Sequence, residues 1–214
     1  LAAVLGWLGE PGPCCAESPL QQLGFPAAEL QLVYRASIHG WGAGDFHAKC
    51  DGQGPTVTVV RCTGGHVLGG YADLAWRSAG GWQASTSAFL FALRCHAGLG
   101  PTKLPLTGRN NGYALGWGSD RGPAFGGGLH VADRANANRA SWSYLVSTYW
   151  VPAGQDRETF LTGATHFQAA EVEVFRVVAA AAAAPAAAAA PAIAAPVQQA
   201  AGGAQPQGAA AAAA

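Results

Sequence analysis

The stretch TVTVVRCTGGHVLGGY, residues 56–71, decides the fold of this 214-residue chain. In its first half, Val57 and Val59 fall on one face of an extended segment and the threonines beside them on the other, which is the two-residue period of a β-strand. The Gly-Gly pair at 64–65 then permits a tight turn, because glycine adopts positive φ at little cost. The apolar segment HVLGGY follows at once. We therefore predict an antiparallel β-hairpin.

Further strand signals occur on both sides of this hairpin. Apolar or alternating patterns appear in LQLVYRAS (30–37), SAFLFALRC (87–95) and EVEVFRV (171–177). The segment 87–95 is apolar on both faces, which places it in the middle of a layered domain. One helix is predicted within GAGDFHAKCDG (42–52), where Asp45 caps the start and Gly52 supplies the left-handed stop. These signals predict a mainly β protein with a few flanking helices, built as a two-layer antiparallel β-sandwich.

The composition divides the chain into three parts. Residues 1–29 are expected to form a short helix over 2–8 followed by a loop. Residues 30–178 carry the strand patterns and form the sandwich domain. Residues 179–214 contain no charged and no aromatic side chain and consist almost entirely of Ala, Pro, Gly and Gln. Alanine buries too little surface to build a core, so we expect a disordered tail.

Charge and cysteine usage exclude several classes of protein. The formal net charge is zero, so a binder of nucleic-acid phosphates, which needs many Lys and Arg, is not expected. The apolar start lacks a basic flank and is broken by Gly and Pro, which disfavours a signal peptide or a membrane span. The cysteines are odd in number and irregularly spaced, which indicates reduced thiols in an intracellular, cytoplasmic protein. They are Cys14, Cys15, Cys50, Cys62 and Cys95.

Nine short strings, in one order, resemble the TLDc domain family. They are YRAS from Tyr34, FHAKCDGQGPTVTVVR from Phe46, GGYADLAW from Gly69, SAFLFAL from Ser87, PTKLPL from Pro101, GPAFGGG from Gly122, ADRANAN from Ala132, FLTG from Phe160 and EVEVFRV from Glu171. Each string alone is weak, but their shared order is specific, and the likeness spans about residues 32–177. One departure stands out. The family's usual Gly-Gly-Gly-His-Asp lacks its last two residues here, because Gly128 runs directly into LHVAD. This loss shortens a surface loop.

The resemblance implies a sandwich of two antiparallel sheets with a few flanking helices. It also implies a role in protection against oxidative stress, and binding to a subunit of the vacuolar-type proton ATPase that regulates pump assembly. No accepted catalytic centre comes with the family. Fold alone does not fix the role of a domain, so each candidate site is weighed on its own residues.

The three glycines Gly126, Gly127 and Gly128 raise the question of a phosphate cradle. Such a loop leads into a helix N-terminus, whose free N–H groups hold the anion, and a Lys usually follows. Here the glycines lead into a strand pattern, LHVAD, with no Lys nearby. We therefore predict a tight corner or bulge where no Cβ fits.

Histidine and cysteine allow two further hypotheses. His47, Cys50, Cys62 and His66 have ligand types suited to a tetrahedral zinc site, but their order and gaps match no standard pattern. Cys50 lies near the predicted C-terminus of its helix beside Asp51, where the thiolate is disfavoured. Packed cysteines are therefore favoured over a metal site or a reactive thiol.

Paired carboxylates and tryptophans complete the candidates. Glu171 and Glu173 lie two apart on a strand, about 7 Å from each other, a separation compatible with acid/base work on glycosides. The favoured interpretation is a solvated face opposite the inward Val172 and Val174, and its functional version is an acidic patch facing a partner. Four tryptophans near turns could line a sugar-binding groove, although packing at the rim of the core is favoured. They are Trp41, Trp76, Trp82 and Trp117.

These residues favour a non-enzymatic protein-binding module. No catalytic residue, cofactor or metal is assigned, and neither nucleic-acid binding nor membrane insertion is expected. Two alternatives stay open, namely a cysteine- or carboxylate-based enzyme or redox protein, and a carbohydrate-binding β-sandwich. The candidate partner-facing or family-motif residues are Gly69, Gly70, Gly126, Gly127, Gly128, Asp133, Glu171 and Glu173.

Overall fold

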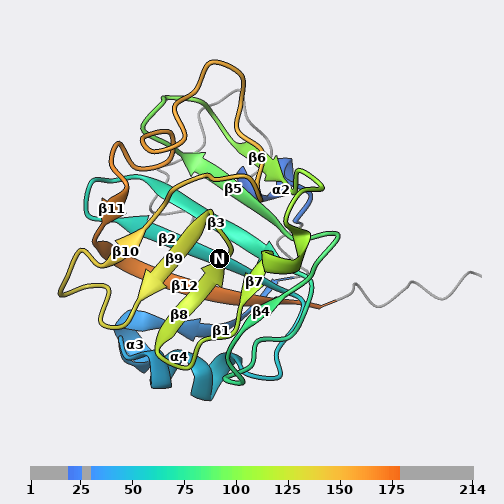
Figure 1. The fold of residues 1–214 in the computed structure, drawn as a ribbon. Helices are drawn as coiled ribbons and strands as arrows, with labels where there is room; N and C mark the ends of the chain where they lie inside the picture. Colours follow the sequence, from blue (N-terminus) through green and yellow to red (C-terminus); the bar gives the residue numbers. More distant parts are fainter. Residues whose placement is uncertain (1–18, 26–29, 179–214) are drawn as a thin grey trace, which may run out of the picture. The chain divides into compact units, whose positions relative to one another are not determined.

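The structure is a computed structural model that describes residues 19–25 and 30–178 (Figure 1). The helix expected over residues 2–8 and the tail expected over residues 179–214 lie outside the described residues. No helix among the described residues is long and apolar enough to cross a membrane.

Short strands make up most of the described chain. The strands are β1 (Leu30–Arg35), β2 (Thr56–Cys62), β3 (Val67–Ala72), β4 (Trp82–Gln83), β5 (Phe89–Arg94), β6 (Thr102–Pro105), β7 (Leu115–Gly116), β8 (Arg121–Phe125), β9 (Leu129–Ala132), β10 (Ser141–Trp142), β11 (His166–Phe167) and β12 (Ala169–Val177). The helical elements are α2 (Pro19–Gln22), α3 (Ala36–His39), α4 (Ala43–Cys50) and the 3₁₀ turn η2 (Asn111–Tyr113).

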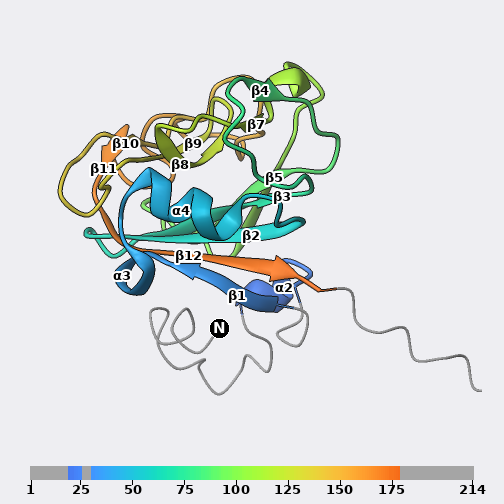
Figure 2. The ribbon, with the colours of Figure 1, turned by 90° about the horizontal axis from the view of Figure 1, so that it is seen from below.

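The strands form two six-stranded antiparallel sheets, as the sequence patterns predict. The first sheet has the order β1-β12-β2-β3-β5-β6, and the second has the order β11-β10-β9-β8-β7-β4. Figure 2 shows the sheets as two layers, with α4 at one open side between β8–β9 and β2–β12. The mainly β sandwich predicted from sequence is confirmed.

The predicted hairpin lies near the centre of the first sheet. β2 pairs with β3 through Val57 opposite Tyr71 and Val59 opposite Gly69. On its other side β2 pairs with β12, the last strand, where Val57 lies opposite Phe175. The strand predicted from the alternation at 171–177 therefore lies beside the first hairpin, and this long-range pairing joins the last strand of the domain to its first half.

Both faces of the first sheet are buried. Its inner face joins the core between the sheets, which includes Val60, Leu68 and Leu90. Its outer face forms a second cluster, in which Leu20 of α2 and Phe25 pack with Val57, Val59, Val67, Phe89, Phe91, Leu93 and Phe175. The threonine face of β2 is consequently buried as well, because it faces the second sheet.

The helix predicted around Phe46 is confirmed as α4, with a different start. Gly42 is the N-cap residue, and Asp45 lies three residues further on, where its Oδ2 accepts a hydrogen bond from the Gly42 N–H at 2.9 Å. The helix is followed by Gly52 with φ 76°, the left-handed stop that the sequence predicts.

Candidate functional site

The glycine run 126–128 forms the tight turn between β8 and β9, and a strand follows it, not a helix. None of the three glycines has room for a side chain. A Cβ built on Gly126 would lie 1.4 Å from the Tyr113 carbonyl oxygen, and one on Gly127 would lie 2.2 Å from Val146 Cγ2. Gly127 also has φ 61°. The glycines therefore serve backbone packing, as predicted, and the turn lacks the helix N-terminus that a phosphate loop requires.

Gly69 and Gly70 are buried and present no surface to a partner. A Cβ on Gly70 would lie 2.6 Å from two ring carbons of Phe125 in the opposite sheet. A Cβ on Gly69 would lie 2.0 Å from the Thr58 carbonyl oxygen and 2.6 Å from Phe91. Gly70 thus sets how closely the two sheets approach, and Gly69 belongs to the packing of the outer face.

The predicted solvated face of Glu171 and Glu173 is wrong. Glu171 is 8% exposed and Glu173 is 0% exposed. β12 lies between β1 and β2, and residues of β1 and α3 cover its two glutamates. Arg35 of β1 donates through Nε to Glu173 Oε1, and burial raises the pKa of Glu173 while the Arg35 charge opposes that rise. The Arg35–Glu173 ion pair therefore links the edge strand β1 to β12.

Glu171 and Asp133 secure the helices α3 and α4. Glu171 Oε1 accepts hydrogen bonds from the backbone N–H of Ser37 in α3 and of Val172, each at 3.1 Å. Asp133, which follows β9, accepts the Ala43 N–H at 2.7 Å and so satisfies a free donor in the first turn of α4. These carboxylates therefore have structural partners within the chain.

The described cysteines are buried and unpaired, and they are Cys50, Cys62 and Cys95. Burial raises the pKa of the Cys62 thiol to about 12 and raises that of Cys50 further, with the charge of Asp51 adding to the effect. A thiolate is needed for nucleophilic or redox chemistry, so these two thiols are poor candidates for it. Cys14 and Cys15 lie outside the described residues.

The four residues of the hypothetical zinc site have other surroundings. His66 lies edge-on to His96 with ring centroids 5.8 Å apart, whereas His47 belongs to the polar network described next. Within residues 19–25 and 30–178, no group of three or more His, Cys, Asp or Glu side chains is arranged to hold a metal ion.

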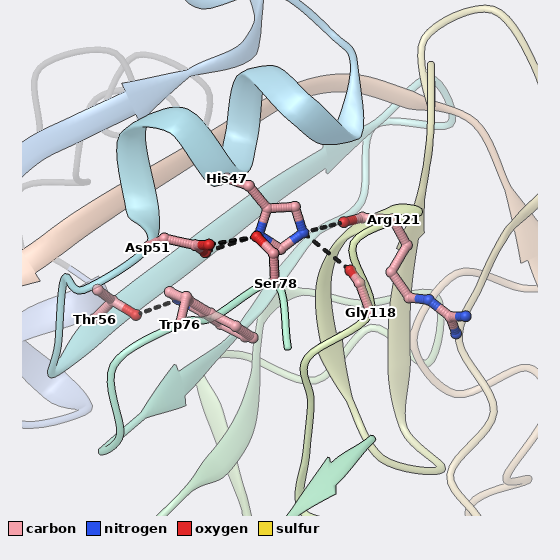
Figure 3. A network of polar contacts seen from close by, with 7 residues as sticks. All are labelled: His47, Asp51, Thr56, Trp76, Ser78, Gly118 and Arg121. Carbon is pink, nitrogen blue, oxygen red and sulfur yellow. Dashed lines mark hydrogen bonds and ion pairs between the residues drawn. The ribbon is translucent and has the colours of Figure 1, made fainter. Parts of the chain in front are cut away.

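His47 joins α4 to the loop before β8 (Figure 3). Its Nδ1 lies 2.8 Å from Asp51 Oδ1, and its Nε2 lies 2.9 Å from the Gly118 carbonyl oxygen and 3.0 Å from that of Arg121. All three partners are acceptors, and each ring nitrogen of His47 faces at least one of them. The Ser78 hydroxyl donates to the second Asp51 oxygen. The side chain of His47 is 9% exposed, so the network acts as a clamp between the helix and the second sheet.

The tryptophans do not form one open platform. Trp76 is 1% exposed and donates through Nε1 to Thr56 Oγ1 at 2.8 Å inside the core (Figure 3). Trp41 lines a cavity of about 10 Å³, which has room for about one water molecule. Trp82 is 40% exposed and packs edge-on against Tyr113, which is 57% exposed. Trp76 and Trp41 are therefore packing residues, whereas Trp82 belongs to an exposed aromatic pair.

An open cleft that the sequence did not predict lies beside the glycine turn. It has a volume of about 400 Å³ and is lined by Thr107, Arg109, Tyr144, Val146, Ser147 and Arg157. The Val146 N–H donates to the Gly127 carbonyl at 2.8 Å, which fixes one wall against the turn. Arg109 and Arg157 lie in loops far apart in sequence and in no motif, so no pattern in the sequence pointed to their meeting.

Comparisons with known proteins agree with the architecture. The family model described as the TLDc domain matches residues 20–178. Interferon-induced protein 44 is 34% identical over 70 residues in both Pan troglodytes and Homo sapiens, which is 33% of this chain and 15% of each relative. MTOR-associated protein MEAK7 of Danio rerio is 29% identical over 76 residues, or 36% of this chain and 17% of the relative. The matches thus span about one sixth of the length of these curated relatives.

The family match takes in most of α2 and all twelve strands that the structure describes. Its two-sheet sandwich is the fold that the resemblance led us to expect. The chain therefore belongs to the TLDc domain family.

Proposed function

We propose that this chain is a non-catalytic, intracellular protein-binding module that acts in oxidative-stress protection or in the assembly of the vacuolar-type proton ATPase. The family match over residues 20–178 carries the proposal. The binding role is supported by the exposed aromatic side chains Trp82, Tyr113 and Trp150, which are 40%, 57% and 45% exposed. Large aromatic residues are enriched at protein interfaces and contribute strongly to binding.

The surroundings of the buried glutamates and cysteines support a non-catalytic role. Glu171 and Glu173 are buried in contacts with α3 and β1, and the pKa values of Cys50 and Cys62 are raised by burial. A general acid or base needs access to substrate, and a nucleophilic thiol needs a lowered pKa. These groups meet neither condition.

An affinity capture from cell lysate with the full 214-residue chain, read by mass spectrometry, tests the proposal. The expected result is recovery of proton-pump subunits, and a Trp82→Ala, Tyr113→Ala variant is expected to recover less. Leu74→Ala is the matched control, because Leu74 is 36% exposed and its loss removes apolar surface elsewhere. The zebrafish relative is described as mTOR-associated, so mTOR components belong in the same readout.

Peroxide turnover by the purified chain decides between binding and redox chemistry. The proposal expects no turnover above that of a Cys50→Ala, Cys62→Ala variant. Turnover that disappears in this variant, together with failure to recover any pump or mTOR component, would replace the binding role by a thiol enzyme.

A further inference from the structure

The cleft beside the glycine turn is lined by cationic and hydroxyl groups. Two of its six lining residues are arginines, three carry hydroxyls and one is apolar. None of the six is acidic. Its volume of about 400 Å³ falls in the range of about 300–1,000 Å³ that is typical of ligand pockets. The lining therefore favours an anionic group as occupant.

Backbone and side-chain hydrogen bonds hold the walls in place. The Thr107 N–H donates to the Thr148 carbonyl at 3.0 Å, and Asn110 Nδ2 donates to the Ser147 hydroxyl. Arg157 Nη1 donates to the carbonyl oxygens of Leu145 and Val146 at 3.0 and 3.1 Å. The cleft is thus built from segments that are tied to one another, which limits the ordering cost of binding.

Neither arginine is neutralised by a carboxylate of the described chain. The ion pairs described there involve other basic groups, namely Arg35, His47, Arg121 and Arg134. Asp156 and Glu158 flank Arg157 in sequence but do not line the cleft. Asp156 Oδ1 accepts the N–H groups of Glu158 and Thr159, which turns it toward its own loop and lowers its pKa.

Donor capacity remains on both guanidinium groups. A guanidinium has five N–H donors, and the bonds described for Arg157 use only Nη1. The Arg109 guanidinium has no hydrogen bond or ion pair within the described residues, and its side chain is exposed. Because Nη1 of Arg157 is already bonded, one edge of the guanidinium, formed by Nε and Nη2, is left to pair with one carboxylate.

An exposed aromatic pair lies on the other side of the glycine turn. The Tyr113 carbonyl closes against Gly126, and Val146 closes against Gly127. The turn therefore separates the cleft from Tyr113 and its edge-on neighbour Trp82. Arg, Trp and Tyr are the residue types that most often dominate binding energy at protein interfaces.

We propose that this cleft binds an acidic segment of a partner protein, with a carboxylate pairing with each of Arg109 and Arg157 and the hydroxyls of Tyr144 and Ser147 donating to the same groups. The Trp82–Tyr113 pair contacts apolar side chains of the same segment. This inference rests on the proposed binding function and assigns it a surface and a partner chemistry.

Fluorescence anisotropy with the full chain tests the assignment. The probe is a labelled peptide of alternating Glu and Leu, and the reference is the same peptide with Gln in place of Glu. The acidic peptide is expected to bind more tightly, with an affinity that falls as salt is added. Arg109→Gln and Arg157→Gln are each expected to weaken binding about tenfold, the loss of one charge-assisted hydrogen bond. Arg139→Gln removes an equal charge elsewhere on the surface and is expected to have no effect.

Amide chemical shifts locate the peptide. Changes are expected at Thr107, Arg109, Val146, Ser147 and Arg157. Arg109→Gln keeps the test valid if Arg157→Gln fails to fold, because no bond described for the Arg109 guanidinium supports the walls. Equal binding of the Gln peptide, shifts confined to another face, or unchanged affinity in Arg109→Gln would overturn the assignment.

Two further arms test the choice of occupant. Tighter binding of a phosphoserine peptide than of the Glu peptide overturns the carboxylate assignment, and so does binding to anionic vesicles that depends on the two arginines. If the Arg109→Gln, Arg157→Gln double variant recovers pump subunits as well as the wild type does, the assignment of the cleft as the binding site is refuted and the proposed function is kept. Peptide binding in the cleft with no partner recovered from lysate supports the cleft and counts against the proposed function.

Discussion

Replacing Gly70 by alanine tests whether the spacing of the two sheets depends on the absence of a side chain at this position. A Cβ there would lie 2.6 Å from two ring carbons of Phe125, whereas carbon atoms in contact prefer about 3.5–4.0 Å. Phe125 is 1% exposed, so its ring has little room to withdraw. The ring or the strand must therefore shift by about 1 Å.

The expected cost follows from two opposing terms. Overpacking a well-filled core costs about 1–3 kcal/mol, and the lower entropy of the unfolded alanine chain returns about 0.5–1 kcal/mol. The difference is a net destabilisation of about 0–2.5 kcal/mol with a midpoint of about 1.3 kcal/mol. At about 2–4 °C per kcal/mol, this midpoint lowers the melting temperature by about 3–5 °C. Urea denaturation followed by tryptophan fluorescence measures the free energy of unfolding.

A double-mutant cycle makes this prediction specific. Phe125→Leu alone destabilises by leaving a cavity, but it also removes the ring atoms that meet the new methyl group. The double variant should therefore be more stable than the sum of the two losses by about 1 kcal/mol. Gly69→Ala is the control, because its Cβ meets the Thr58 carbonyl at 2.0 Å and Phe125→Leu does not relieve that contact. Additivity of the Gly70 pair within about 0.5 kcal/mol would refute the reasoning.

Three other variants test the polar groups. His47→Ala removes the ring nitrogens that face Asp51 Oδ1 and the carbonyls of Gly118 and Arg121, so a loss of about 2–3 kcal/mol is expected in thermal unfolding, and a smaller loss for His47→Gln. Burial and the Arg121 charge lower the pKa of His130 from 6.5 to about 4. A histidine with a lowered folded-state pKa loses stability as pH falls, so the wild type should lose stability between pH 6.5 and 4 relative to His130→Gln, and a ring titration near pH 6.5 by NMR would contradict this. Burial raises the pKa of Glu173, so the stability that this carboxyl contributes is present below its ordinary value of 4.5 and is lost as pH rises through the folded-state value. Glu173→Gln should lack that loss, and parallel pH profiles of the two proteins would count against it.

Strand positions followed closely from the sequence because alternation and turns are local properties. The predicted strand 56–62 coincides with β2, and the helix predicted within 42–52 contains α4. What covers each strand face was harder to predict from the sequence. The alternation of Glu and Val at 171–174 indicates which side chains share a face, but not whether that face is covered. Coverage depends on β1 and on Arg35, which pair with β12 from the far end of the chain.

The candidate site could not be predicted for the same reason. Arg109 and Arg157 each look like ordinary loop residues, and only the packing of the two loops brings them to one cleft. The glycine turn illustrates the opposite case. Its lack of side-chain space was predicted, because a run of glycines before a strand signals close backbone approach. The atoms that approach, from Tyr113 and Val146, came only from the structure.

The low number of charged residues in this chain makes the two arginines of the cleft, Arg109 and Arg157, informative. Charged residues make up 11% of this chain, well below the roughly 25% of an average soluble domain. Carboxylates at 133, 171 and 173 are engaged with α4, α3 and β1, so they hold the N-terminal helices and the edge strand. Arg109 and Arg157 line one cleft without an acidic partner in the described chain. Arg157 supports the fold through Nη1 alone, so its other donors and the Arg109 guanidinium remain for a carboxylate of a partner.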